Sequence, residues 1–469
     1  MSGDAPGTAD ERLARFGYRP ELRRTLGLFA SFGIAFSYVS PVVGVYTLFG
    51  YGLATGGPAF LWSLPLVVGG QLLVVLVFSE VAASFPLAGA LYQWGRRLVG
   101  PRYGFFVGWI YGWALVVTIA AVDFGAAPYL ASLLGLAGDR GTLVFLALGL
   151  LLVHSAFNAM GVKATSAVTS FGVAVEVIAT VVIAGALVAT GLHQKAGVLF
   201  TTAPAPSPYL PAFLASSLAM AWIFYGFESA ADVAEEVVHP GRHVPRAMIL
   251  SLLGAALVTF VVEVALILGA RDLRAAAADP GATIPLILGD HFGPGGRAFV
   301  VALVVFAYFS CAAAAQAAAA RLIFSYARDG MLPASTWLRA VNAQGVPAHA
   351  IAFTAVAGAF VTSGTFVEVR GVNANALLVA YAVAGIYLSF QAVVAGRLLA
   401  AARGWRPDGE FQLGRASVAV AVAALVYGLA MLVNLCWPRP ADEVAGWLPL
   451  ASAVAIVVPG ALLARARRS

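Results

Sequence analysis

Residues 221–246 read AWIFYGFESAADVAEEVVHPGRHVPR, and the centre of this stretch places a glycine and a carboxylate in apolar surroundings. Gly226 weakens a helix because it has no side chain. A charge on Glu228 near the middle of a bilayer would cost about 3 kcal/mol or more. Both residues are tolerated where the backbone lines a cavity instead of facing lipid. We therefore predict that residues 224–229 form the unwound middle of a broken membrane helix.

A second interruption is predicted at residues 37–44, which read SYVSPVVG inside another apolar stretch. Pro41 removes a backbone N–H and disfavours helix at Ser40. A simple proline kink would explain this pattern on its own. However, two interrupted helices at corresponding positions of two halves indicate a transport site near the middle of the membrane.

The two interruptions would expose backbone groups that have lost their helical partners. Freed N–H groups at the start of a half-helix attract a carboxylate, and freed carbonyls at the end of one attract an ammonium group. Such a pair of breaks could hold a zwitterion, with side chains of other helices adding specificity. The predicted substrate-binding residues are Val39, Ser40, Val42, Val43, Gly44, Phe224, Tyr225, Gly226, Phe227, Glu228 and Tyr381.

The composition predicts an all-α polytopic membrane protein. Of the 469 residues, 61% are hydrophobic and 11% are charged, and the mean hydropathy is +0.88. Soluble domains are about 25% charged. A membrane span needs about 20 apolar residues. Twelve candidates are found, at residues 27–52, 58–84, 104–132, 141–160, 164–190, 211–236, 244–269, 297–327, 348–366, 373–400, 415–437 and 445–464.

The short connections predict one membrane domain. It would comprise a cytoplasmic tail (1–26), a transport core of ten helices (27–400), and two further helices with a short cytoplasmic C-terminus (401–469). Helices 1–5 and 6–10 would be inverted repeats, because each group of five begins with a broken helix. We expect no removable signal peptide in residues 1–26, since no short apolar region precedes a cleavage site there.

The net charge of +6 is explained by topology and not by a nucleic-acid partner. With the N-terminus inside, 21 lysines and arginines fall on the inner side and 7 on the outer side. This asymmetry follows the positive-inside rule. Both termini are therefore predicted to be cytoplasmic, in a multi-pass protein of the cytoplasmic membrane. Cys311 and Cys436 are too few and too scattered to indicate a disulfide framework or a metal site.

Several motifs resemble one family of permeases. The second span ends in SEVAASFPLAGALY, the fourth ends in NAMGVK, the sixth joins WIFYGFES to EEVVHPGRHVP, and the eighth is followed by ARDGMLP. These motifs resemble the amino acid–polyamine–organocation family. YGLATGGP and AAVDF look like its amino acid/choline branch, which includes GABA and choline permeases. The resemblance covers about residues 25–400.

The resemblance implies a LeuT-like fold with 5+5 inverted repeats, alternating access, and an amino acid or small amine as substrate. Trp222 falls where a member of the family has a gating tryptophan, and Glu228 falls on that member's glutamate. Trp222 and Phe227 would close over the substrate. Alternatively, Trp222 could be a bulky side chain that faces lipid and has no gating role. Glu228 could change its charge with the transport state or pair with a substrate amine.

Glu176 is the predicted coupling residue, together with Glu228. It stands alone among apolar neighbours, at a position where some family members place a lysine. Two cations are possible: sodium, bound by Glu176 with first-span carbonyls and the Ser310 hydroxyl, or a proton on Glu176 itself. We favour the proton, because an isolated carboxylate in a dry span is costly when charged. In the third alternative, Glu176 only bonds the carbonyls of the first span.

Other polar residues in the spans are predicted to be structural. Glu80 would anchor a helix end, Asp123 would bond a neighbouring span or attract an amine, and His154 would be a packing residue with satisfied hydrogen bonds. Glu263 would lie in a vestibule or a helix contact.

Glu235 and Glu236 would reach the cytoplasmic surface beside Arg242 and Arg246, as an inner gate or loop clamp without ligand contact. They directly follow the sixth span.

The expected function is secondary active transport of GABA, choline or a similar amino compound, coupled to protons. The alternatives are an amino acid or amine exchanger without ion coupling, a transport-dead membrane sensor, and a channel. The sequence has no nucleotide-binding P-loop, HExxH or GxSxG motif, which argues against an ATP-driven pump and a membrane hydrolase, so we do not expect an enzyme. No cofactor besides H⁺ or Na⁺ is expected, and the expected partners are a small-molecule substrate and the lipid bilayer.

Overall fold

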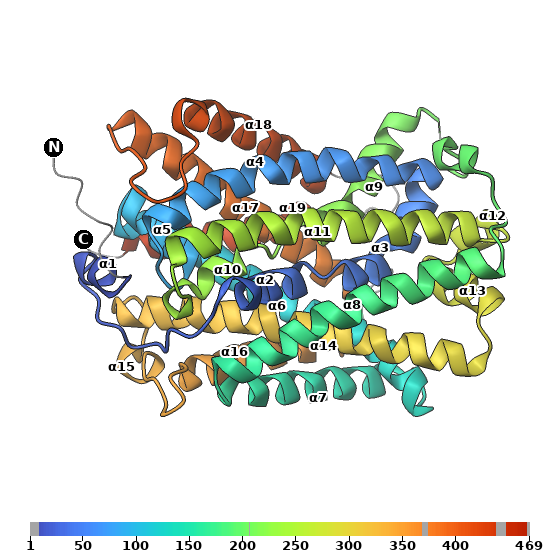
Figure 1. The fold of residues 1–469 in the computed structure, drawn as a ribbon, viewed down its shortest axis with the longest axis horizontal. Coiled ribbons are helices and arrows are strands. Elements are labelled where there is room, and N and C mark those ends of the chain that lie inside the picture. Colours follow the sequence, from blue (N-terminus) through green and yellow to red (C-terminus); the bar gives the residue numbers. More distant parts are fainter. Residues whose placement is uncertain (1–8, 206, 368–373, 438–446, 467–469) are drawn as a thin grey trace.

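Long apolar helices running side by side dominate the computed structural model, which describes residues 9–205, 207–367, 374–437 and 447–466 (Figure 1). Among these residues, ten helices are long and apolar enough to cross a membrane, and two further apolar helices are shorter, Tyr209–Ile223 and Ala348–Gly364. All regular secondary structure in the described residues is helical, apart from a single parallel bridge between Leu26 and Val237. These features are those of a polytopic membrane protein.

The helices of the first half of the chain are α1 (Ala9–Arg15), α2 (Leu28–Val39), α3 (Pro41–Gly56), α4 (Ser63–Ser84), α5 (Ala90–Leu98), α6 (Pro101–Leu134), α7 (Arg140–Ala159) and α8 (Val162–Thr190). Those of the second half are α9 (Tyr209–Ile223), α10 (Ser229–Asp232), α11 (Pro240–Gly269), α12 (Leu273–Ala278), α13 (Thr283–His291), α14 (Pro294–Arg328), α15 (Ser335–Leu338), α16 (Ala348–Gly364), α17 (Ala374–Ala402), α18 (Ser417–Cys436) and α19 (Leu448–Ala466).

The first predicted span is interrupted where its sequence indicates. Ser40 adopts a left-handed conformation (φ 39°) between α2 and α3, and Pro41 occupies the first position of α3. The Ser40 hydroxyl accepts a hydrogen bond from the Val43 N–H at 3.4 Å, so it caps the new helix. Proline suits a first helical position because its missing N–H would have no partner there.

The sixth predicted span is also interrupted. Helix α9 ends at Ile223, the following residues through Glu228 are not helical, and α10 begins at Ser229. Gly226 has a φ of +107°, which L side chains rarely adopt. The predicted unwound stretch of 224–229 therefore matches the structure except at its last residue, which starts α10.

The centre of the bundle is formed by α6, which packs along α14 and α17, while α11 packs against α2 and α4. Helix α1 lies at one end of the bundle, and α12 and α13 lie at the other end (Figure 1). All three predicted regions include residues outside the described part of the chain: the tail (1–8), the transport core (206 and 368–373) and the C-terminal region (438–446 and 467–469).

Candidate functional site

The two interrupted helices touch each other in the middle of the bundle. A Cβ atom added to Gly44 would lie 2.2 Å from Cγ1 of Ile223, and one added to Gly226 would lie 2.8 Å from Cγ of Tyr38. Only glycine allows the backbones to approach so closely. The sequence therefore brings the two unwound stretches into direct contact at the residues where each helix is broken.

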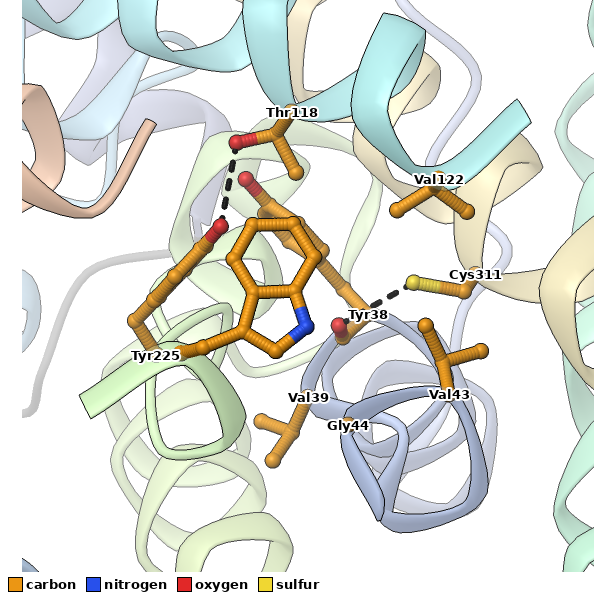
Figure 2. Close-up of a pocket in the computed structure, with 9 residues that line it drawn as sticks. Tyr38, Val39, Val43, Gly44, Thr118, Val122, Tyr225 and Cys311 are labelled. Atoms are coloured by element: carbon orange, nitrogen blue, oxygen red, sulfur yellow. Dashed lines mark hydrogen bonds between the residues drawn. The ribbon is translucent and has the colours of Figure 1, made fainter. Parts of the chain in front are cut away.

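A small cavity of about 10 Å³ lies at this contact (Figure 2). Such a volume holds roughly one water molecule. The Thr118 and Tyr225 hydroxyls hydrogen bond at 3.2 Å, and the Cys311 thiol donates to the Tyr38 carbonyl at 3.4 Å, which is freed by the break. The cavity is lined by Tyr38, Val39, Val43, Gly44, Thr118, Val122, Trp222, Tyr225 and Cys311.

Five of the predicted residues line this cavity: Val39, Val43, Gly44, Trp222 and Tyr225. Others lie behind its wall, namely Ser40, Val42, Phe224, Gly226, Phe227 and Glu228, all of which are buried. Phe227 packs against the rings of Phe78 and Phe390, with centroids 6.2 and 5.5 Å away. Tyr381 is half-buried and is not among the residues that line this cavity. The binding and gating roles of all these residues stay predictions.

The remaining lining residues were missed by the sequence analysis. Tyr38 lies inside the predicted first break but was not singled out, while Thr118, Val122 and Cys311 come from α6 and α14. Nothing in the local sequence distinguishes these three residues from the apolar and small residues around them. Their position depends on how α6 and α14 pack against the two breaks.

Glu228 holds the second break in shape. Its Oε2 atom accepts the Gly226 N–H at 2.9 Å, and its Oε1 atom lies 3.2 Å from the Tyr111 hydroxyl. The same hydroxyl donates to Oδ2 of Asp232 at 2.6 Å. One tyrosine hydroxyl thus bridges two buried carboxyl groups. Asp232 was also missed, although its spacing of four residues from Glu228 was a signal that could have found it.

Glu176 faces the first break through its carboxylate. The backbone N–H of Val42, in the first turn of α3, donates to Oε2 of Glu176 at 3.3 Å. No ion pair joins this carboxylate to a cationic side chain in the described part of the chain. Glu176 therefore contacts an N–H group of the first span, and not the carbonyls considered above. Ser310 donates to the Ser37 hydroxyl at 3.2 Å.

A much larger cavity of about 890 Å³ opens toward the end of the bundle that carries α12 and α13. It is lined by residues of α3, α6, α7, α13, α14 and α17 and of the segment before α13, and Tyr381 is not among them. Tyr308, one of these residues, shares a hydrogen bond of 2.9 Å with Thr47 and lies 3.5 Å from the Val43 carbonyl, and Val43 lines the small cavity. A thin polar and aromatic layer thus separates this larger cavity, which we call the vestibule, from the small cavity, which we call the central site.

Comparison of the sequence with known proteins shows the family of the chain. The sequence pattern of the amino acid permease family matches residues 26–461, nearly the whole chain. The chain belongs to the amino acid permease family. This family is part of the amino acid–polyamine–organocation superfamily.

Three relatives show the breadth of the similarity. "Amino-acid permease BAT1 homolog" of rice (Oryza sativa subsp. japonica) is 26% identical over 93% of this permease and 89% of its own length. "Amino-acid permease BAT1" of Arabidopsis thaliana is 24% identical, and the match covers 91% of this permease and 88% of the relative. "Thiamine transporter thi9" of Schizosaccharomyces pombe is 24% identical, and the match covers 91% of this permease and 80% of the relative. The family indicates a transporter of amino acids or small organic compounds, and not an enzyme.

Buried ion pairs close the permease at the end opposite the vestibule. Arg328 forms two hydrogen bonds of 2.8 Å with Glu235, and Arg321 binds Glu236 at 2.8 and 3.1 Å. The side chains are at most 5% exposed. The prediction that both glutamates reach the surface beside Arg242 and Arg246 is therefore wrong. Their partners come from α14, because a buried carboxylate needs a buried cation.

Glu80, in contrast, is the helix-end anchor that the sequence predicts. Its carboxylate accepts hydrogen bonds from Arg397 at 3.1 Å, from the Leu413 N–H at 3.0 Å, and from the Ser417 hydroxyl. It thereby ties the end of α4 to α17 and α18. Both oxygens of Glu263 lack a hydrogen-bond partner in the described part of the chain, and the side chain is buried in α11.

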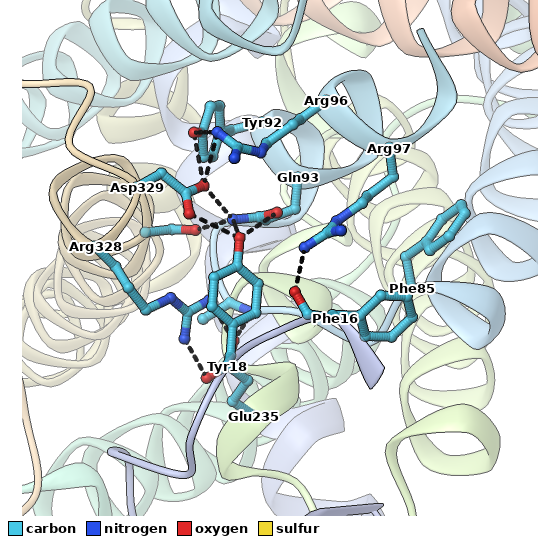
Figure 3. A network of polar contacts seen from close by, with 12 residues as sticks. Phe16, Tyr18, Phe85, Tyr92, Gln93, Arg96, Arg97, Glu235, Arg328 and Asp329 are labelled. Carbon is cyan, nitrogen blue, oxygen red and sulfur yellow. Dashed lines mark hydrogen bonds and ion pairs between the residues drawn. The ribbon is translucent and has the colours of Figure 1, made fainter. Parts of the chain in front are cut away.

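The segment between α1 and α2 crosses the closed end as a strap, residues 16–26 (Figure 3). The Tyr18 hydroxyl donates to Oδ1 of Asp329 at 2.8 Å, and the Arg328 guanidinium lies 3.8 Å from the centre of the Tyr18 ring. Burial and the neighbouring Asp329 carboxylate raise the pKa of the Tyr18 hydroxyl. The hydroxyl therefore keeps its proton and remains a donor at neutral pH.

The strap also pairs with the backbone that follows the second break. The N–H groups of Thr25 and Leu26 donate to the Glu236 carbonyl at 2.9 Å each, and the Val238 N–H donates to the Leu26 carbonyl at 2.8 Å. The strap thus covers Glu235 and Glu236 and joins them to α14.

Replacing Tyr18 by alanine is expected to loosen this closed end. A hydrogen bond to a charged group contributes about 1.5–3 kcal/mol, and a cation–π contact contributes about 0.5–1 kcal/mol. Hydrogen–deuterium exchange of the amides of residues 229–238 should therefore become at least about tenfold faster. Tyr18→Phe keeps the aromatic ring but loses the hydroxyl, so its exchange rate should lie between those of the wild type and Tyr18→Ala. Unchanged exchange in Tyr18→Ala would show that the strap is only a passive covering.

Proposed function

We propose that this permease is a secondary active transporter that carries amino acids or small amines across the cytoplasmic membrane by alternating access. The observation that carries the proposal is the contact between the two broken helices at a closed central cavity. A wide vestibule approaches this cavity from one end, and buried ion pairs and the strap seal the other end. A site reached from one side at a time is what alternating access requires.

We further propose twelve transmembrane helices in a LeuT-like arrangement. The first repeat would contain α2–α3, α4, α6, α7 and α8, and the second α9–α10, α11, α14, α16 and α17, with α18 and α19 outside. Short helices support this division. Helix α5 follows α4, the second long helix of the first repeat. Helices α12 and α13 follow α11, the second long helix of the second repeat, and they lie at the opposite end of the bundle from α5 (Figure 1). Inverted repeats place equivalent connections on opposite sides in this way.

The cavity wall supports an amine-bearing substrate. Tyr38, Trp222 and Tyr225 present aromatic rings, and aromatic faces attract ammonium groups. Glu228 lies directly behind this wall, where it can compensate a positive charge. GABA, choline or a similar amino compound fits this chemistry, as the resemblance to the amino acid/choline branch implies. Because the cavity has a volume of only about 10 Å³ here, the two breaks must separate to admit such a molecule.

Coupling to protons through Glu176 completes the proposal. Its carboxyl group is fully buried, lies against the first break, and has no ion-pair partner in the described part of the chain. A neutral, protonated carboxyl is the form that such surroundings favour. Sodium bound by Glu176 and Ser310 is the alternative. We also propose that both ends of the chain are cytoplasmic, which would place the strap inside and the vestibule outside.

Uptake into proteoliposomes tests the function. The candidates are GABA, choline, ethanolamine, and neutral and basic amino acids, each with and without a pH gradient and a sodium gradient. Saturable uptake of at least one compound, raised by an inward proton gradient, is expected. Exchange without any effect of either gradient would favour an uncoupled exchanger, and flux that does not saturate would favour a channel. Binding without any flux would indicate a sensor.

A further inference from the structure

Five polar side chains form a buried network between α6, α7 and α14. Asp123 Oδ2 lies 3.1 Å from His154 Nε2, and His154 Nδ1 lies 3.0 Å from Gln316 Oε1. Gln316 also contacts Asn158 at 2.9 Å and Ser155 at 2.6 Å. Asp123 and His154 are at most 1% exposed. The predicted bond of Asp123 to a neighbouring span is thus found, and both His154 nitrogens are satisfied as expected.

Two backbone carbonyls fix the direction of every hydrogen bond in this network except the one between Asp123 and His154. Asn158 Nδ2 donates to the Ala313 carbonyl at 3.0 Å, so the Gln316 atom beside the same Nδ2 must be an acceptor, Oε1. The Ser155 hydroxyl donates to the Leu151 carbonyl at 2.6 Å, so it must accept from Gln316 Nε2. Both ends give Gln316 the same orientation. His154 Nδ1 therefore carries a hydrogen, which it donates to Oε1 of Gln316.

The assignment of the hydrogen on Nδ1 also determines how many protons lie between Asp123 and His154. With Nδ1 protonated, a neutral imidazole has a lone pair on Nε2. A lone pair 3.1 Å from an ionised carboxylate oxygen would be repelled, so one proton must lie between the two atoms. We propose that Asp123 and His154 form a proton-binding site, separate from Glu176, that holds one exchangeable proton in this state. The proton is either on Nε2 of an imidazolium or on Oδ2 of a carboxylic acid.

The site lies directly behind the central cavity. Val122, the neighbour of Asp123, lines that cavity, as does Cys311 of α14, which interacts electrostatically with both Asp123 and Glu176. Cys311 is therefore a titratable group near Asp123, and Glu176 is a titratable group near Cys311. Both are neutral when protonated, so neither compensates a negative charge on the pair.

This location links the proton to the charge of the bound molecule. When the proton leaves, neutral His154 and the Asp123 carboxylate carry a net charge of −1 in a buried place. A cation in the cavity stabilises that charge, so cation binding and proton release favour each other. For two unit charges in protein surroundings, the expected effect is on the order of tenfold. The ligand class is an organic ammonium ion, and this step rests on the proposed function.

Nuclear magnetic resonance of the histidine nitrogens in nanodiscs tests the proton site without any substrate. The His154 signals are assigned by their loss in His154→Gln. As the pH rises, we expect Nδ1 to stay protonated and Nε2 to show one titration step. Asp123→Asn should abolish the step, because the asparagine NH₂ donates to Nε2 and preserves the contact without a mobile proton. Glu176→Gln is the matched control and should retain it.

Two outcomes would overturn the proton site. One is the absence of any step in the wild type between pH 5 and pH 10 (about the range in which membrane proteins stay folded). The other is an unchanged step in Asp123→Asn. A merely structural pair would show only lower thermal stability in that variant. These results do not depend on transport, so the proton site and the proposed function can fail separately.

Choline tests the link to a bound cation, because it is permanently charged and has no proton of its own to lose. Saturating choline should move the step by about one pH unit toward acid in the wild type, equivalent to a tenfold easier release. GABA, which has no net charge, should move it less. If saturating choline does not shift the titration step, the proposed link between cation binding and proton release is wrong.

Discussion

Glu228→Gln is expected to lower the initial rate of substrate uptake by about 30- to 100-fold while the permease still inserts and folds. The carboxylate lies behind the cavity wall and contacts both Gly226 and Tyr111. Loss of an interaction with a charged group costs about 2–3 kcal/mol, and each 1.4 kcal/mol corresponds to a factor of ten. Glutamine keeps the shape of the side chain, so the charge is the main change. Radiolabelled uptake into proteoliposomes, normalised to reconstituted protein, measures the effect.

Asp232→Asn is the matched control for this variant. Asp232 shares the Tyr111 hydroxyl with Glu228, but it lies four residues farther along the chain, in α10. We expect its loss to reduce uptake less than tenfold. Monodisperse elution and an unchanged melting temperature would confirm that both variants fold. If Glu228→Gln transports at the normal rate and with the normal pH dependence, Glu228 has only a structural role.

Glu176→Gln is expected to separate exchange from accumulation. Glutamine resembles the protonated carboxyl group, so exchange of internal for external substrate should continue at a rate within about threefold of the wild type. Accumulation driven by a pH gradient should disappear, because the side chain can no longer release a proton. Preloaded and empty proteoliposomes, assayed with and without a pH gradient, distinguish the two activities.

Two results would contradict proton coupling through Glu176. Persistence of pH-driven accumulation in Glu176→Gln would exclude this residue as the coupling site. Uptake by the wild type that requires sodium would favour the other cation. Ser310→Ala is the informative companion variant, since it should impair only a sodium-coupled permease.

The fold was largely predictable because the membrane makes helix positions a local property. The span predicted at 164–190 is α8, Val162–Thr190, and the one predicted at 348–366 is α16, Ala348–Gly364. The breaks were predictable for the same reason, since proline and glycine act on their own backbone. The short helices α5, α12 and α13 were not predicted, because they lack the long apolar run that identifies a membrane span.

The site was predicted less completely, because much of it is created by packing between distant parts of the chain. Val43 and Trp222 lie within a few residues of the breaks and were identified. Cys311 lies in an alanine-rich stretch and becomes a lining residue only when α14 meets the first break. Similarly, Glu235 could be recognised as a gate residue, but its partner Arg328 is 93 residues away. No local pattern indicates such a pairing.

The difference in size between the two cavities has an electrical consequence. A vestibule of about 890 Å³ fills with water and ions, so little of the transmembrane voltage falls along it. The voltage instead drops across the remaining closed layer, from the Tyr308–Thr47 contact to the Arg321–Glu236 pair. A charge that crosses only this layer gains nearly the full energy of crossing the membrane, about 2.3 kcal/mol per 100 mV. A charge can therefore draw on almost all of the membrane potential by crossing this layer alone, without moving through the full thickness of the membrane.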